Sequence, residues 1–210
     1  MGELYLHDLK PYIDKYGCNV FVETGTGVGT GIQHALRYDF KKLYTIEIME
    51  ELWKHCKKEI KDPRVDFIHN NSLDGMKGIL EEVKDEECVF FWLDAHFPGA
   101  DFHFNDYEHL KDQPKLHKPL KDEVLMIKEA RPNAKDVFII DDLRIYEDGP
   151  FEHGSWSDRK LYGGDGIGFI EELVDDTHYV VKSYNQQGYI MLFPVTKDIE
   201  EEAENLIVGV

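Results

Sequence analysis

The sequence is poor in basic residues and has no long hydrophobic run. Lysine and arginine together number 24 against 42 aspartates and glutamates, which gives a formal net charge of −18. A chain this acidic repels the phosphates of nucleic acid, so DNA or RNA binding is not expected. Apolar runs such as residues 89–93 are far too short to cross a bilayer, and no membrane association is expected.

The amino terminus lacks a secretion signal, and cysteine is scarce. Residues 1–10 carry acids where a signal peptide has bases, and they contain no apolar core segment. Cys18, Cys56 and Cys88 are widely spaced and form no CxxC pair, so neither a disulfide framework nor a thiolate zinc site is expected. The composition favours a reducing, cytoplasmic compartment.

Hydrophobic residues make up 42% of the 210 residues and aromatic residues 12%, enough to bury a substantial interior. A length of this size suits one domain, residues 1–210. Apolar runs typical of buried strands alternate with segments of helical periodicity. The expected strands are residues 18–23, 43–48, 65–69, 88–94 and 136–141, and the expected helices are residues 31–38, 49–60, 72–83 and 121–130.

Continuous apolar strands indicate a sheet that is covered on both faces. The segments 179–184 and 188–193 are separated by only three residues, too few for a parallel crossover, so they should form an antiparallel hairpin. The sequence therefore predicts an α/β, Rossmann-like, doubly wound and mostly parallel seven-stranded sheet with a C-terminal antiparallel hairpin.

A glycine-rich turn directly follows the first expected strand. Residues 20–31 read VFVETGTGVGTG, and such glycines let a ligand approach the backbone. The G-x-G-x-x-G dinucleotide fingerprint is not met, because Thr30 stands at its third glycine, and a nicotinamide oxidoreductase is therefore a distant alternative. Glu23 precedes the glycines, and Glu47 follows at about the 20-residue spacing of a ribose-binding acid. The plainer alternative is a turn that only packs helix against strand.

This pattern resembles the class I S-adenosylmethionine-dependent methyltransferases, whose first motif reads E/D-x-G-x-G-x-G; here residues 23–29 read ETGTGVG. The resemblance covers nearly the whole chain. It implies that the methionine portion of the cofactor lies at the turn, the ribose at Glu47 and the adenine end at Asn71 and Ser72, although Asn71 or Ser72 also suits a helix cap. The implied cofactor-binding residues are Glu23, Thr24, Gly25, Gly27, Gly29, Glu47, Asn71, Ser72 and Asp94.

Three carboxylates close two expected strands, Asp94 in WLDAH and the pair Asp141 and Asp142 in IIDDL. Crowded carboxylates without cysteine suit a hard cation such as Mg²⁺, or Mn²⁺, so we expect a metal site at these three acids. The alternative for Asp142 is a helix cap. Asp94 and His96 are the candidates for the base that removes a proton from an acceptor hydroxyl.

The paired acids resemble those of metal-dependent sugar O-methyltransferases of the macrolide and rhamnosyl type, with viral rhamnose O-methyltransferase domains as the nearest likeness. The resemblance implies a sugar or glycoconjugate acceptor, and a host cytoplasm if the chain is viral. Two long irregular stretches, residues 97–119 and 144–164, are expected lids over the acceptor. The expected substrate contacts are His96, Phe97, Tyr146 and Trp156.

The leading hypothesis is thus a Mg²⁺-assisted, S-adenosylmethionine-dependent O-methyltransferase that acts on a sugar hydroxyl. A catechol-type methyltransferase is the second hypothesis, because a cation also chelates adjacent hydroxyls of an aromatic diol. A non-catalytic module that binds a nucleoside or glycan is the third. A homo-oligomer, or membership of a longer multidomain polypeptide, is compatible with each.

Overall fold

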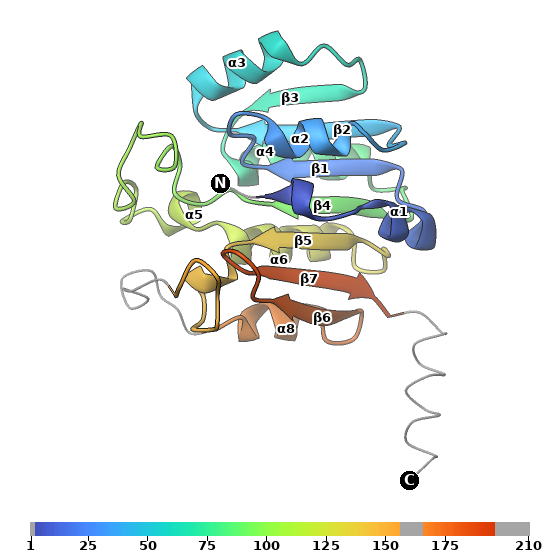
Figure 1. The fold of residues 1–210 in the computed structure, drawn as a ribbon. Helices are drawn as coiled ribbons and strands as arrows, with labels where there is room; N and C mark the ends of the chain where they lie inside the picture. Colours follow the sequence, from blue (N-terminus) through green and yellow to red (C-terminus); the bar gives the residue numbers. More distant parts are fainter. Residues whose placement is uncertain (1–2, 156–165, 196–210) are drawn as a thin grey trace.

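A computed structural model describes residues 3–155 and 166–195 of the chain (Figure 1). One seven-stranded sheet forms its centre, in the order β3-β2-β1-β4-β5-β7-β6. The first five strands are parallel, and β7 runs antiparallel to both β5 and β6, so the predicted fold class is confirmed. The strands are β1 Val20–Thr24, β2 Lys42–Glu47, β3 Val65–His69, β4 Val89–Leu93, β5 Val137–Asp141, β6 His178–Ser183 and β7 Tyr189–Pro194.

Helices cover both faces of this sheet because side chains alternate along each strand. Val22, Phe91 and Phe138 pack with α4, α6 and α8 in one core. Phe21 and Phe90 pack with η1, α1 and α2 in the other. The helices are η1 Leu4–Leu6, α1 Lys10–Tyr16, α2 Thr30–Ala35, α3 Glu50–Glu59, α4 Ser72–Glu82, α5 Pro114–His117, α6 Leu120–Ala130, η2 Leu143–Ile145 and α8 Gly168–Val174.

The carboxyl ends of the parallel strands share one edge, at the left of Figure 1, and the segment that follows β4 extends from it. Of the first expected lid, residues 97–119, a short part is the helix α5, and the rest is turns. The second expected lid begins with η2, and its residues 156–164 lie outside the described part of the chain. Within the described residues, no helix is both long and apolar enough to cross a membrane.

The prediction that the cysteines form no disulfide is wrong. Cys18 and Cys88 are joined by a disulfide, with their Cα atoms 4.7 Å apart. They lie just before β1 and β4, which are neighbours in the sheet although 70 residues separate the two cysteines. Sequence spacing does not reveal this proximity, because the crossover that places β4 beside β1 is decided by the fold. The compartment inferred from cysteine usage loses that support.

Candidate functional site

A pocket of about 800 Å³ lies at the carboxyl edge of the sheet, where the glycine turn, β2, β4 and the start of α4 meet. It brings together nine residues that the sequence singled out, namely Glu23, Gly25, Gly27, Glu47, Asn71, Ser72, Asp94, His96 and Phe97.

The glycine turn lies directly against the end of β4. Gly25 has a left-handed φ of 79°, and a Cβ there would lie 2.4 Å from the carbonyl oxygen of Asp94. Only glycine permits this approach without a shift of the backbone. The turn therefore places the pocket floor and Asp94 in contact.

Glu47 ends β2 and anchors the turn from the opposite side. Its Oε2 accepts a hydrogen bond from the Gly27 amide, and its Oε1 accepts one from the Met49 amide, both at 2.8 Å. Burial raises the Glu47 pKa, and these amide hydrogen bonds oppose that rise. A carboxylate has four lone pairs, so Glu47 can accept from a ligand hydroxyl in addition to these amides.

Glu23 lies beneath the turn and is only 1% exposed. Burial raises its pKa to about 8, although the Thr45 hydroxyl donates to its Oε2 at 2.5 Å. A Cβ at Gly31 would collide with Glu23 Oε1, so α2 also packs directly on this carboxylate. Glu23 thus supports the turn as well as lining the pocket.

Three of the implied cofactor-binding residues have local structural roles, namely Thr24, Gly29 and Asn71. Thr24 is fully buried and does not line the pocket; its Oγ1 accepts the Asp94 amide at 3.3 Å. Gly29 precedes α2 with a φ of 85° and packs against Cys56. Asn71 caps α4 by accepting the Asp74 amide at 2.9 Å, the alternative that residue statistics favoured.

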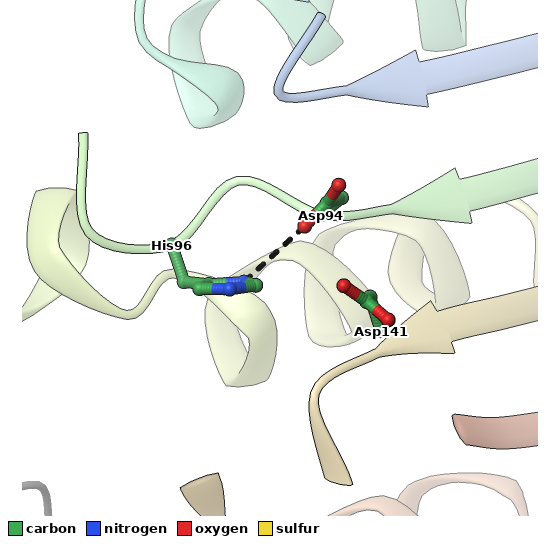
Figure 2. A group of neighbouring side chains, drawn as sticks. All are labelled: Asp94, His96 and Asp141. Carbon is green, nitrogen blue, oxygen red and sulfur yellow. Dashed lines mark ion pairs between the residues drawn. The ribbon is translucent and has the colours of Figure 1, made fainter. Parts of the chain in front are cut away.

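Asp94, His96 and Asp141 form an acidic cluster beside the pocket (Figure 2). One ligand atom from each residue lies within 4.8 Å of the others, and His96 Nδ1 is 3.6 Å from Asp94 Oδ1. Both carboxylate oxygens of Asp141 are buried without a hydrogen-bond partner. Burial, followed by the charges of Asp94 and Asp142, raises the Asp141 pKa well above its usual range. A cation suits such a cluster because it offsets this repulsion.

Asp142, the third expected metal ligand, forms hydrogen bonds with His96 and Arg144 instead. Its backbone is left-handed, with a φ of 58°. Its Oδ2 lies 2.7 Å from His96 Nε2, and its Oδ1 accepts from Arg144 Nε at 3.0 Å. The described residues therefore present His96, rather than Asp142, as the third member of the cluster.

His96 and Asp142 shift each other's ionisation. Burial lowers the His96 pKa, but the hydrogen bond and charge of Asp142 and the charge of Asp141 outweigh it, so the His96 pKa is raised. Burial likewise raises the Asp142 pKa, but the His96 hydrogen bond, His96 and Arg144 outweigh it, and the Asp142 pKa is lowered. Both shifts favour a charged imidazolium–carboxylate pair.

The expected substrate residues are separated in space. Phe97 is 4% exposed and lines the pocket, where its amide donates to the His117 carbonyl at 2.9 Å. Tyr146 is buried and lines a smaller cavity behind the cluster. Trp156 lies outside the described residues.

The pocket also contains Trp92, which sequence reasoning missed, and two residues of the first expected lid, Phe102 and Lys115. Trp92 lines it from β4, and Lys115 lines it from α5. Phe102 packs on the turn, because a Cβ at Gly27 would lie 2.8 Å from the Phe102 ring. Trp92 directly opposes Glu23 in the sheet, a pairing that needs the strand register.

No family model and no curated protein sequence matches the chain. Among solved structures, an O-methyltransferase from Bacillus cereus in complex with SAH is 15% identical, with 89% of this chain and 79% of that one covered and a TM-score of 0.53. The O-methyltransferase TomG from Streptomyces achromogenes, involved in tomaymycin synthesis and solved with SAM, is 15% identical, with coverage of 90% and 78% and a TM-score of 0.51.

A methyltransferase from Geobacter sulfurreducens is 14% identical, with 92% of this chain and 76% of that one covered and a TM-score of 0.51. The likeness to each of the three extends over most of both chains. At such low sequence identity, it establishes the fold alone. The chain therefore has the Rossmann-like α/β fold of class I methyltransferases.

Proposed function

We propose that the protein is an S-adenosylmethionine-dependent O-methyltransferase that uses a divalent cation. One observation carries the proposal: the pocket floored by the ETGTGVG turn adjoins a cluster in which a buried carboxylate, Asp141, has no partner. The O-methyltransferases among the structural neighbours support the same activity.

The pocket residues fit the cofactor chemically. The Glu47 carboxylate suits a ribose hydroxyl, and Gly25 and Gly27 line the pocket with backbone that carries no side chain. Asn70, Asn71 and Ser72 line the pocket on the adenine side in this proposal. When bound, S-adenosylmethionine supplies an electrophilic methyl group on its sulfonium.

The donor set also fits a divalent cation. Asp94 and Asp141 offer carboxylate oxygens, the ligands that Mg²⁺ and Mn²⁺ prefer, and His96 Nδ1 is a third donor within reach. When bound, such a cation lowers the pKa of an alcohol and fixes its oxygen in place. The oxygens of Asp141, which are buried without a hydrogen-bond partner, support a cation at this site.

Residues of the chain then remove the proton of the acceptor hydroxyl. Asp142 holds His96 through Nε2, so Nδ1 is the ring atom that faces Asp94 and the cluster. As a base, His96 acts in its neutral form and does not bind the cation, which Asp94 and Asp141 then hold: Nδ1 takes the proton from the acceptor hydroxyl, and Asp142 stabilises the imidazolium that forms. Arg144 keeps the Asp142 carboxylate oriented toward His96.

We propose a sugar or glycoconjugate as the acceptor. Phe97 and Phe102 line the pocket, and Phe104 and Tyr107 are exposed on the segment after β4. Aromatic rings stack well on the apolar faces of sugars. A small aromatic diol is the second candidate, and the tomaymycin-synthesis O-methyltransferase among the structural neighbours supports a small-molecule acceptor.

Isothermal titration with S-adenosylmethionine and SAH, with Mg²⁺ or Mn²⁺ and again with EDTA, tests the proposal without knowledge of the acceptor. Micromolar binding supports the activity, and no binding under any condition overturns it. A panel of deoxysugars and catechols then identifies the acceptor class, and full turnover in EDTA would exclude the cation. Binding without turnover on any acceptor would favour a non-catalytic module.

His96→Ala separates the two roles open to His96. If His96 serves as the base, the variant keeps cation affinity and loses turnover. A fall in Mn²⁺ affinity in titrations of the variant would instead make His96 a ligand.

A further inference from the structure

Thr45 lies on β2 behind the glycine turn, and the proposed mechanism does not use it. It is 1% exposed and does not itself line the pocket. Glu23 is its direct neighbour in the parallel pairing of β1 with β2, so the two side chains lie on the same face of the sheet. Because buried hydroxyls need hydrogen-bond partners, the partners of Thr45 show what it holds in place.

The Thr45 hydroxyl has two partners, and both belong to residues that line the pocket. Its Oγ1 donates to Glu23 Oε2 at 2.5 Å and lies 2.5 Å from Thr26 Oγ1. Glu23 and Thr26 both line the pocket. A continuous chain of hydrogen bonds therefore runs from the Glu23 carboxylate through Thr45 to the hydroxyl in the glycine turn.

The number of protons available fixes the direction of this chain. A hydroxyl carries a single proton, and Thr45 gives its proton to ionised Glu23. Thr26 must therefore be the donor in the hydrogen bond that its hydroxyl shares with Thr45. The Thr26 oxygen keeps only lone pairs for further partners, so it can accept a hydrogen bond from a bound ligand but cannot donate one.

The next residue along β2 holds the backbone of the same turn. The Ile46 carbonyl accepts the amide of Gly25 at 2.9 Å and the amide of Thr26 at 3.2 Å. Thr26 is thus bound to β2 twice, through its amide at Ile46 and through its hydroxyl at Thr45. Loss of the Thr45 hydroxyl would release the Thr26 side chain and leave the backbone of the turn bound.

From these contacts we infer that Thr45 is a positioning residue, which orients the Glu23 carboxylate and the Thr26 hydroxyl as two hydrogen-bond acceptors for the cofactor. The inference rests on the proposed function. Thr45→Val keeps the shape of the side chain but removes the hydroxyl, so Glu23 and Thr26 would each lose a partner. Thr45→Ser would keep the hydroxyl and both hydrogen bonds.

The test compares Thr45→Val and Thr45→Ser with the control Thr177→Val. Thr177 is a half-buried threonine directly before β6, where it bonds Lys128 and the Val174 carbonyl away from the pocket. SAH is titrated at about pH 9, where Glu23, with its pKa of about 8, is ionised. We expect Thr45→Val to weaken SAH binding about tenfold, a loss typical of about one net hydrogen bond, and Thr45→Ser and the control to retain affinity within about threefold. Urea unfolding of each variant at the same pH shows that it is folded during the titration.

A double-mutant cycle with Thr26→Val shows whether the effect passes along the chain of hydrogen bonds. Thr26→Val alone should reproduce part of the loss, and it should add little in the Thr45→Val background. Full additivity, unchanged SAH affinity in Thr45→Val, or a Thr45→Ser protein that binds as weakly as Thr45→Val would overturn the inference. If Thr45→Val does not fold, unchanged SAH affinity in Thr26→Val overturns it. Failure of the unaltered chain to bind SAH would instead overturn the proposed function, so the two failures are distinguishable.

Discussion

Strand β5 has a buried aspartate at each end, and the two aspartates differ in their hydrogen-bond partners. Asp136, just before the strand, accepts from Arg131 Nε at 2.8 Å, from Arg131 Nη2 at 2.7 Å and from the Val89 amide at 2.8 Å. Asp141, its last residue, is 2% exposed, yet neither of its oxygens has a partner. Both oxygens of Asp136 accept hydrogen bonds, whereas neither oxygen of Asp141 does.

The same contrast extends to the two edges of the sheet. The amino edge is closed by internal bonds, namely the Arg131–Asp136 pair and the Cys18–Cys88 disulfide. The carboxyl edge holds Asp141, which has no hydrogen-bond partner. Burial raises the pKa of Asp136 and of Asp141 alike, so the two edges differ in pairing and not in the direction of the pKa shift. Because an unpartnered buried carboxylate costs stability, its retention at the carboxyl edge supports the cation site proposed above, whereas the bonds at the amino edge stabilise the fold.

Removal of Arg131 should produce the largest loss of stability. Arg131→Leu leaves Asp136 buried and unpaired, and breaking a buried ion pair in this way typically costs about 3–5 kcal/mol. Urea unfolding measures the loss, and the double variant Arg131→Leu, Asp136→Leu should recover much of it. A loss below about 1 kcal/mol would show that the pair does not hold the amino edge.

The disulfide at the same edge should contribute nearly as much. Its loop spans a sequence separation of 70, and loop-closure entropy predicts a contribution of about 4 kcal/mol, within the 2–5 kcal/mol typical of such bonds. Dithiothreitol should lower the urea midpoint of the unaltered chain and leave that of the Cys18→Ala, Cys88→Ala variant unchanged. Equal sensitivity of the two would contradict the assignment.

At the carboxyl edge, replacement of a buried acid should not lower stability. Asp141→Asn removes a buried charge that repels Asp94 and Asp142, so the free energy of unfolding should stay the same or increase. Turnover should nevertheless fall at least about 10²-fold, with SAH affinity largely retained. Asp136→Asn is the matched change at the other end of β5, and it should lower stability instead. A loss of stability in Asp141→Asn would contradict the proposed difference between Asp136 and Asp141.

The pH dependence of stability gives a slope rather than a single loss. The folded protein raises the Glu23 pKa from 4.5 to about 8, so between these values the folded state holds a proton that the unfolded state has lost. This term is therefore most favourable below about pH 4.5 and is lost as the pH rises to about 8, at no more than roughly 1.4 kcal/mol per pH unit.

Urea unfolding at several pH values in this range, compared between the unaltered chain and Glu23→Gln, isolates the Glu23 contribution. The variant should show a flatter pH dependence. The exposed control Glu50→Gln should follow the unaltered chain. Parallel curves for the unaltered chain and Glu23→Gln would mean that burial does not perturb Glu23 as described.

Much of the fold was predictable because its signals are local. The apolar runs that became β4 and β5 are continuous, since both faces of these strands are covered. The short loop before β7 required an antiparallel hairpin, and the structure contains one. The helix α8 was missed, because its seven residues carry too little periodicity to stand out. The expected helix at residues 31–38 is helical only to Ala35 and ends in a turn.

The candidate site was predictable only in part. Glu23, Glu47 and Asp94 lie in the pocket because each ends a parallel strand, and such ends share one edge. The exchange of roles between Asp142 and His96 was not predictable, since it depends on the left-handed backbone at Asp142 and on a contact across 46 residues.

The sequence by itself determined the order of strands and helices and the chemistry of the glycine turn, because both depend on residues close together in the chain. The tertiary structure alone decided which acids have partners. Asp136 and Asp141 lie five positions apart, just before β5 and at its end, but the first meets Arg131 and the Val89 amide, whereas the second meets other carboxylates. Burial and pairing are properties of the folded environment, and in this protein they separate the paired Asp136 from Asp141, which has no hydrogen-bond partner.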